Sequence, residues 1–353
     1  MKSPFALPEM SLLWRIVFAL GIGLLSGALA FLIGLPLPWM LGPMIGTTAA
    51  AMLNLAVSGP GRVRPFVIPV IGVMLGSTLT PESFANAGQW VVTLALLPPF
   101  LIATAAASYV MYRRIGGFDP VSAYYSAMPG GLNDMLILGA EQGGDERRIA
   151  LAHAARILVV VAGVVLFYGL VLGVAAPQGQ RWFPMSALTL SDWLILGACA
   201  LVGGVVGPRL HLPAAAVFGP MILSGVVHLT GIVTVPPPTA MVIVAQVVIG
   251  TVIGCRFAGA NPRDVLRDLG LSALSSLIMI AVAVFFALVV HRFGGTALTQ
   301  AFLAYSPGGL AEMSLLALAM EQDAAYVSLT HVARLFLVIG LASWMLRMIR
   351  RLG

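Results

Sequence analysis

Long stretches that are nearly free of charged residues constrain the fold of this chain more than any other feature. They lie at residues 16–34, 89–112, 149–175, 269–290 and 335–346. Most of them approach the roughly 20 residues that a helix needs to cross a bilayer. Only 9% of the 353 residues are charged and 59% are hydrophobic, too few charges to cover a soluble protein of this size. The sequence therefore predicts an all-α polytopic membrane protein that sits in a lipid bilayer.

The charge pattern excludes several classes of function. The net charge is +6, but the arginines are scattered between apolar runs, which is typical of membrane-flanking residues. No basic run with interleaved aromatics is present, so we expect no nucleic acid as partner. Cys199 and Cys255 belong to no metal or redox motif, and no cofactor fingerprint occurs. We therefore expect no metal, no cofactor and no enzymatic activity.

The chain is an internal duplication. Residues 129–156 read PGGLNDMLILGAEQGGDERRIALAHAAR and residues 307–334 read PGGLAEMSLLALAMEQDAAYVSLTHVAR, identical at 11 of 28 positions. The offset is 178 residues, and upstream glycines such as Gly72 and Gly250 follow it within a residue. Such self-similarity marks a repeated structural unit. We predict a first membrane repeat at 1–176, a linker at 177–184 and a second membrane repeat at 185–353.

Each repeat shows five apolar spans and one polar, glycine-broken segment. The predicted spans are 12–34, 37–56, 65–81, 89–112 and 147–173, then 190–208, 212–232, 239–257, 269–290 and 325–346. The broken segments are 118–145 and 296–323. If each broken segment is re-entrant, the repeats are inverted and nearly all arginines fall on one side. This favours ten crossings in a bacterial inner membrane with both termini cytoplasmic. In a variant, the broken segment crosses and a short span such as 65–81 is re-entrant.

The broken segments contain the Pro-Gly-Gly elements Pro129-Gly130-Gly131 and Pro307-Gly308-Gly309. Proline and adjacent glycines interrupt a helix. In a membrane such irregular backbone is tolerated only where it is buried or lines a wet cavity. The helix that follows each break points its free N–H groups towards the break and attracts an anion. The alternative is that each Pro-Gly-Gly corner simply turns a hairpin.

Polar residues surround both breaks. Asp134 and Glu312 occupy equivalent positions, and an intramembrane carboxylate indicates a role in binding a proton, Na⁺ or an arginine. A His-x-x-Arg pair follows in each repeat, with His153 three residues before Arg156. The fork of a buried guanidinium suits an anionic substrate. Equally, each arginine could pair with the carboxylate of its own hairpin, and Asp145 and Asp323 are expected to cap the helices that follow.

Two sets of candidate site residues result. The predicted substrate-binding residues are Ser126, Pro129, Gly130, Gly131, Asn133, Arg156, Ser306, Pro307, Gly308, Gly309 and Arg334. The predicted residues for the coupling ion or proton are Asp134, His153, Glu312 and His331.

The paired motifs PGGLNDM…HAAR and PGGLAEMS…HVAR, preceded by GPMIG and GPMIL, resemble the AbrB-type family of bacterial membrane proteins. The resemblance covers nearly the whole chain and implies an internally duplicated membrane protein. Some members of the family are labelled ammonia monooxygenases and others regulators of gene expression. The residues here offer no metal ligands for a monooxygenase, and nothing supports a link to the soluble DNA-binding regulator that shares the name. The arrangement of spans is also similar to that of elevator-type carboxylate transporters.

The sequence favours a secondary transporter of small anionic solutes, with carboxylates as the expected class. Coupling to Na⁺ or H⁺, elevator-like motion and a possible homodimer complete this hypothesis. The alternatives are a membrane sensor or regulator that acts through a partner protein and, least favoured, a membrane monooxygenase.

Overall fold

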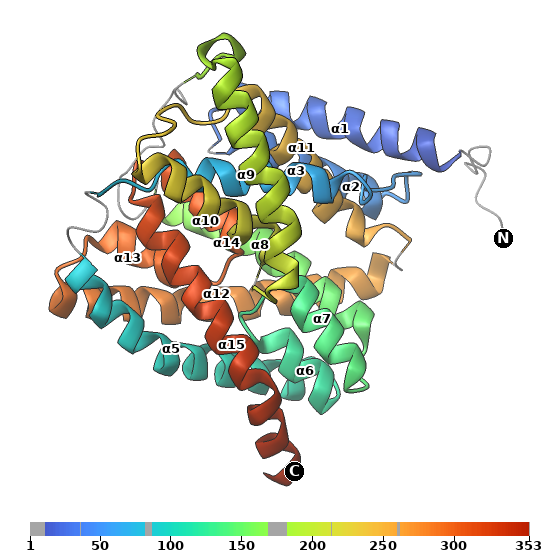
Figure 1. The fold of residues 1–353 in the computed structure, drawn as a ribbon. Coiled ribbons are helices and arrows are strands. Elements are labelled where there is room, and N and C mark those ends of the chain that lie inside the picture. The colour runs from blue at the N-terminus through green and yellow to red at the C-terminus, as the bar shows by residue number, and fades with distance from the viewer. Residues whose placement is uncertain are drawn as a thin grey trace.

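The structure of the chain is a computed structural model that describes residues 11–35, 37–81, 87–168, 182–212, 214–259 and 262–352. Their regular secondary structure is entirely helical (Figure 1). The first half contains α1 (Leu12–Leu32), α2 (Pro38–Met52), α3 (Arg64–Gly76), α5 (Ala87–Arg114), α6 (Pro120–Ala127), α7 (Leu132–Glu141) and α8 (Glu146–Leu166). The second half contains α9 (Leu190–Arg209), α10 (Ala215–Leu229), α11 (Thr239–Gly254), the 3₁₀ turn η3 (Cys255–Phe257), α12 (Pro262–Gly294), α13 (Leu298–Tyr305), α14 (Leu310–Ala319) and α15 (Ala324–Leu352).

The two halves contain the same series of helices. Adding 178 to the bounds of α6 gives 298–305, which are the bounds of α13, and adding 178 to those of α7 gives 310–319, the bounds of α14. The other pairs, from α1 with α9 to α8 with α15, begin within three residues of the same offset. The duplication in sequence is therefore a duplication of helices. Residues 177–181 of the predicted linker lie outside the described residues.

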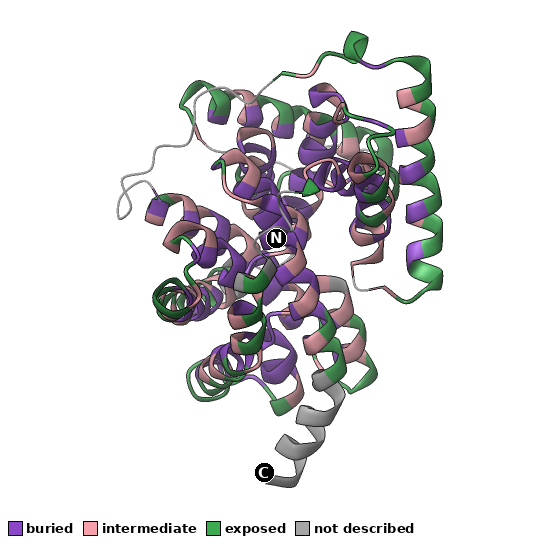
Figure 2. Cartoon of the chain, turned by 60° about the vertical axis from the view of Figure 1, so that its left-hand side comes forward, coloured by how far each residue is buried: buried purple, intermediate pink, exposed green. Residues whose placement is uncertain are grey.

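Six helices of the described part are long and apolar enough to cross a bilayer. They are Leu12–Leu32, Trp90–Arg114, Glu146–Leu166, Leu190–Arg209, Thr239–Phe257 and Leu266–Gly294. The shortest of them, with 19 residues, is about 28 Å long at 1.5 Å per residue, close to the thickness of a hydrocarbon core. Figure 2 shows that exposed residues lie on the outward sides of the peripheral helices, while buried residues concentrate in the centre. The predicted multi-pass membrane protein is confirmed.

The second and third helices of the first half are shorter than the predicted spans, and so is α10 in the second half. The span Thr239–Phe257, formed by α11 and η3, has the predicted bounds. Helix α2 has 15 residues and α3 has 13, against predictions of 37–56 and 65–81. Helix α3 ends at Gly76, where the hydroxyls of Ser77 and Thr78 donate to the carbonyls of Met74 and Leu75. These local hydrogen bonds compete with continuation of the helix, which the apolar run alone did not reveal.

The helices form two groups, both drawn from the two halves. The small-residue bundle consists of α1, α2, α3, α9, α10 and α11, and the hairpin bundle of α5–α8 and α12–α15 (Figure 1). The main contacts between the bundles join α3 to α14 and α15, and α2 and η3 to α8. Most helix packing therefore lies within each bundle.

Glycine permits the close helix packing of the small-residue bundle. A Cβ atom on Gly72 would collide with the carbonyl oxygen of Val217, and one on Gly250 with that of Met40. A Cβ on Gly219 would likewise meet the carbonyl of Gly203. Because the obstacles are backbone atoms, no side-chain movement relieves the clash. Small residues at these positions therefore let the helix backbones approach one another closely.

Candidate functional site

Each predicted broken segment is a pair of short helices joined by a non-helical elbow. Helix α6 begins at Pro120, where Asp119 accepts hydrogen bonds from the backbone N–H groups of Val121 and Ser122. It ends at Ala127, the backbone angles of Met128 and Gly131 are extended, and α7 begins at Leu132. In the second hairpin, Ser306 to Gly309 form the elbow between α13 and α14. We call residues 128–131 and 306–309 the first and second elbows.

The glycines of the elbows make room for neighbouring side chains. A Cβ on Gly130 would lie 2.9 Å from Cε of Met135 and 2.9 Å from Cγ1 of Val338. A Cβ on Gly308 would lie 2.6 Å from Cε of Met313. None of the four elbow glycines has a positive φ. Their absent side chain, rather than an unusual backbone angle, is what the fold requires here.

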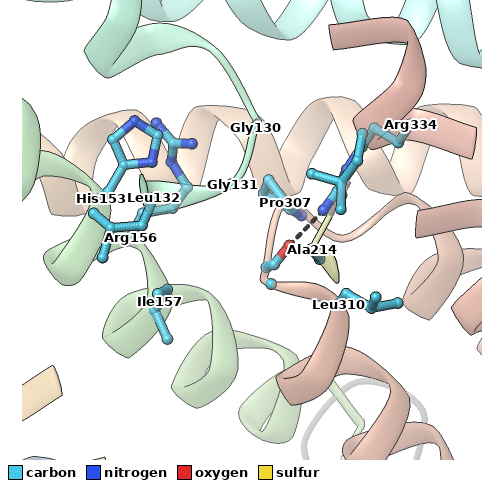
Figure 3. Close-up of a pocket in the computed structure, with 13 residues that line it drawn as sticks. Gly130, Gly131, Leu132, His153, Arg156, Ile157, Ala214, Pro307, Leu310 and Arg334 are labelled. Carbon is cyan, nitrogen blue, oxygen red and sulfur yellow. Dashed lines mark hydrogen bonds between the residues drawn. The ribbon is translucent and has the colours of Figure 1, made fainter. Parts of the chain in front are cut away.

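The structure brings both elbows to one pocket (Figure 3). Its volume is about 80 Å³. The lining comprises Gly130, Gly131, Leu132, His153, Arg156, Ile157, Ala214, Pro307, Gly308, Gly309, Leu310, Arg334 and Leu335. Figure 3 shows His153 and Arg156 on one side, Arg334 on the other, and elbow residues between them. Residues from the two halves, nearly two hundred positions apart in the chain, thus share a single site.

Each pocket arginine holds the elbow of its own hairpin through backbone carbonyls. Arg156 donates to the carbonyl oxygens of Met128, at 2.8 Å, and Ser126. Arg334 donates to those of Ser306, at 2.8 Å, and Gly308, at 2.5 Å. The carbonyls of Ser126, Met128 and Ser306 lie where α6 and α13 end, and that of Gly308 lies in the second elbow. The arginine forks therefore fix the elbows in place.

The predicted alternative, in which each arginine pairs with the carboxylate of its hairpin, does not occur. Among the described residues, the ion pair within 4.0 Å is that of Arg148 with Asp145, at the surface. Arg156 and Arg334 are 3% and 1% exposed, and carbonyl oxygens replace the expected carboxylates. A carbonyl neutralises no charge, so two buried positive charges remain at the pocket.

The two carboxylates fold back over the first turns of their own helices. A Cβ on Gly131 would meet Oδ2 of Asp134 at 2.5 Å, and one on Gly309 would collide with Oε2 of Glu312. Both acids thus lie near a helix N-terminus, where negative charge is favoured. Glu312 is buried and Asp134 is half-buried. They lie beside the elbows but do not line the pocket.

The two histidines are placed differently. His153 lines the pocket, and its Nε2 lies 2.9 Å from the carbonyl oxygen of Tyr125. His331 uses Nδ1 to contact the carbonyl of Val327 on its own helix, at 2.9 Å. Its Nε2 is buried with no hydrogen-bond partner in the described structure. Of the two histidines, only His153 therefore lines the pocket in the described structure.

Several predicted binding residues lie away from the pocket. The hydroxyl of Ser306 donates to the carbonyl of Phe302, at 2.7 Å, and that of Ser126 is buried without a partner. These serines contribute their carbonyl oxygens to the arginines, not their hydroxyls to the pocket. Pro307 lines the pocket but Pro129 does not. The side chain of Asn133 lies outside the described residues. The binding and coupling roles assigned to all these positions stay predictions.

Sequence reasoning missed the apolar part of the lining. Ile157 and Leu335 follow Arg156 and Arg334 directly at equivalent positions, a signal that the duplication contains. Leu132 and Leu310 begin the helices after the elbows. Ala214 comes from the small-residue bundle, has a φ of 46° and offers no signal in sequence. The pocket therefore combines two cationic groups with carbon-rich walls.

Comparison with known proteins shows the family to which this chain belongs. The model of a family described as "Transition state regulatory protein AbrB" matches residues 7–350. The chain belongs to this family. It is 28% identical over 330 residues to "Putative regulator AbrB" of Escherichia coli (strain K12), over 92% of this chain and 93% of that protein. It is 25% identical over 360 residues to "Uncharacterized protein YhjN" of Bacillus subtilis (strain 168), over 94% and 92%. The resemblance to the AbrB family is confirmed, and these names assign no substrate.

Proposed function

We propose that the protein is a secondary transporter of small anionic solutes, with carboxylates as the expected class. The observation that supports this most directly is the pair of buried guanidiniums, one from each half, at one pocket without a carboxylate partner among the described residues. Two helix N-termini, those of α7 and α14, add positive potential beside the elbows. A buried positive site of this kind favours a bound anion. The carbon-rich lining suits a solute with a short apolar part.

In this proposal, Asp134 and Glu312 couple the transport of the anion to that of a cation. Asp134 and Glu312 occupy the helix N-termini that an incoming anion would use, so carboxylate and solute compete for the same positive ends. Binding of a proton or Na⁺ to either acid removes that competition. In this proposal a coupling cation and the anion therefore enter the site together.

Motion is assigned to the boundary between the bundles. The main contacts across it involve α3 with α14 and α15, and α2 and η3 with α8. A rigid displacement of the hairpin bundle against the small-residue bundle would break few contacts and expose the pocket on alternate sides. The proposal includes inverted repeats, ten crossings and cytoplasmic termini in an inner membrane, because this topology collects nearly all arginines on one side.

The test is uptake of labelled small carboxylates into proteoliposomes that contain the full chain. In Arg156→Lys the charge remains, but an ammonium does not reproduce the planar fork of the guanidinium. If Arg156 binds the solute, the KM rises about tenfold or more, equivalent to about 1.4 kcal/mol of lost binding. Arg148→Lys, at the surface, is the matched control and leaves KM unchanged. Wild-type protein that moves no anion in any tested gradient would overturn the proposal.

A second candidate is a membrane sensor that uses the same pocket and signals through a partner. The name of the Escherichia coli relative, a regulator, favours it. Solute-dependent thermal stabilisation of the purified protein without any flux would select the sensor over the transporter.

A further inference from the structure

His153 contributes a hydrogen-bond acceptor to the lining of the pocket. Its Nε2 lies 2.9 Å from the carbonyl oxygen of Tyr125. A carbonyl only accepts, so Nε2 carries a proton, and Nδ1 of a neutral ring is then an acceptor. Nδ1 makes no hydrogen bond in the described structure, and the residue lines the pocket (Figure 3). The pocket thus has an acceptor that no group in the described part of the chain uses.

The charges around His153 favour a neutral ring. Arg156 lies three residues further along α8, and Figure 3 shows both side chains on the same side of the pocket. Arg256 in η3 is also within electrostatic range of the ring. Among the described residues, no acid forms an ion pair with any of the three. A second proton on the ring would add a third positive charge to this group, so Nδ1 remains an acceptor.

The equivalent histidine of the second half does not offer this acceptor to the pocket. Nδ1 of His331 lies 2.9 Å from the carbonyl oxygen of Val327, so here the proton is on Nδ1. The Nε2 atom of His331 is buried, and the residue does not line the pocket. The two histidines therefore hold opposite tautomers. The acceptor at the pocket belongs to the first half alone.

The guanidiniums that would hold an anion lie beside this acceptor. Arg334 uses two of its five N–H donors for the second elbow, and its Nε makes no hydrogen bond in the described structure. Arg156 likewise donates to two carbonyls of its own hairpin. His153 and Arg156 are neighbours on one helix face, with about 5–6 Å expected between their Cβ atoms. A carboxylate at the guanidinium and a hydroxyl on the adjacent carbon suit this spacing.

The lining also disfavours a cationic group in the solute. It contains no acidic side chain, because Asp134 and Glu312 lie beside the elbows and do not line the pocket. An ammonium group would meet two guanidiniums there without a carboxylate to offset the repulsion. A hydroxyl brings no charge and can donate to Nδ1 of His153. The side chains of the pocket thus favour a solute that combines a carboxylate with a hydroxyl.

We propose that the solute is a small 2-hydroxycarboxylate. Its carboxylate binds the guanidiniums of the pocket, and its hydroxyl donates to Nδ1 of His153. The proposal rests on the proposed transport function and names the class of solute at the same site. It gives His153 a role in selecting the solute, in place of the predicted role in coupling.

The first experiment compares three probes with the same carbon skeleton. Lactate carries a hydroxyl next to its carboxylate, propionate carries a hydrogen there, and alanine carries an ammonium group. A site that hydrogen-bonds a hydroxyl rejects the analogue that lacks it. In proteoliposomes that contain the full chain, we expect kcat/KM for lactate to exceed that for propionate about tenfold or more. Alanine should be the poorest of the three. Equal values for lactate and propionate would overturn the proposal and leave the proposed transport of carboxylates intact.

The second experiment assigns the preference to His153. His153→Phe removes the acceptor and also the hydrogen bond to the carbonyl of Tyr125. Loss of that structural bond slows the uptake of lactate and propionate alike, so the measured quantity is the ratio of their kcat/KM values. We expect the ratio to fall to about one, because only the hydroxyl uses the acceptor. His331→Phe, the equivalent change away from the pocket, should leave the ratio unchanged. A preference for lactate that persists in His153→Phe would overturn the proposal.

A third measurement separates this proposal from the proposed function. If wild-type protein moves none of the three probes, the transport function fails. Calorimetric titration of the purified full chain with lactate and with propionate then still tests the site. A Kd for lactate about tenfold lower than that for propionate supports the 2-hydroxycarboxylate. Equal Kd values, or no binding of either probe, would overturn it.

Discussion

The two hairpins have the same backbone and different surroundings. Helix α14 packs against α3 and α15, and most of its residues are buried. Helix α7 packs against α6 and α8, and Ile137 on it is 57% exposed. Glu312 also lies within electrostatic range of Arg64, whereas the position equivalent to Arg64 is Val242. A duplicated element has thus acquired one embedded copy and one open copy.

The difference has a mechanistic meaning for the proposed transporter. The second hairpin contacts the small-residue bundle through α14 and α3. A displacement of one bundle against the other would therefore change the contacts of this hairpin. The first hairpin is held within its own bundle. The side of the pocket beside α7 is therefore where we expect solute to enter in this conformation.

The largest expected effect comes from removing the arginine of the embedded hairpin. Arg334→Ala deletes two charged hydrogen bonds and leaves the carbonyls of Ser306 and Gly308 buried without a donor. The free energy of unfolding should fall by about 3 kcal/mol. Arg156→Ala should cost nearly as much, because its two hydrogen bonds are equivalent. Unfolding in mixed micelles measures both. A loss below about 1 kcal/mol in either variant would show that the fork does not hold its elbow.

A second comparison uses the elbow glycines. In Gly130→Ala the new methyl group meets Cγ1 of Val338, a stiff, buried side chain, as well as Met135. In Gly308→Ala it meets only Met313 among its nearest neighbours, whose thioether can move aside. We expect losses in unfolding free energy of about 2 and about 1 kcal/mol, respectively. The reverse order would mean that the second elbow is the more tightly packed one.

A third prediction removes a bond that is specific to the embedded hairpin. The hydroxyl of Ser328 on α15 donates to that of Ser314 on α14 at 2.8 Å, and the equivalent positions, Ala150 and Leu136, lack hydroxyls. Ser328→Ala should cost about 1 kcal/mol. Hydrogen exchange by mass spectrometry should show slower exchange in α14 than in α7 for the wild type, and a smaller difference in the variant. Unchanged exchange in α14 would contradict this role for the bond.

Much of this architecture follows from local sequence. The apolar runs gave the long helices, and the Pro-Gly-Gly elements gave the elbows, because proline and paired glycines break a helix whatever surrounds them. The predicted caps also hold: Asp145 accepts from the backbone of Arg147 and Arg148, and Asp323 from that of Tyr326.

The features that the sequence did not predict depend on contacts that local sequence does not specify. The expected pairing of each arginine with a carboxylate does not occur, because backbone carbonyls at the elbows accept the hydrogen bonds of the guanidiniums instead. Ala214 enters the pocket from another bundle, and no periodicity reports that. The unequal burial of the hairpins is invisible as well, because Asp134 and Glu312 are equivalent in sequence and differ only in what packs over them.

The smallest expected effect concerns the residues that follow the two hairpins, at the N-termini of α8 and α15. After the first, Arg148 lies 3.7 Å from Asp145 and its guanidinium lies 4.8 Å above the ring of Phe118; after the second, Tyr326 takes the place of Arg148. Because the ion pair is partly exposed, Arg148→Ala should cost only about 0.5 kcal/mol of unfolding free energy. The cap of Asp145 on the backbone does not need Arg148, so Asp145→Ala should cost about 1 kcal/mol whether or not Arg148 is present. A double-mutant cycle in mixed micelles measures the coupling. A coupling energy between Arg148 and Asp145 well above about 1 kcal/mol would contradict this prediction. It would mean that this ion pair stabilises the first hairpin as strongly as the contacts of α14 stabilise the second.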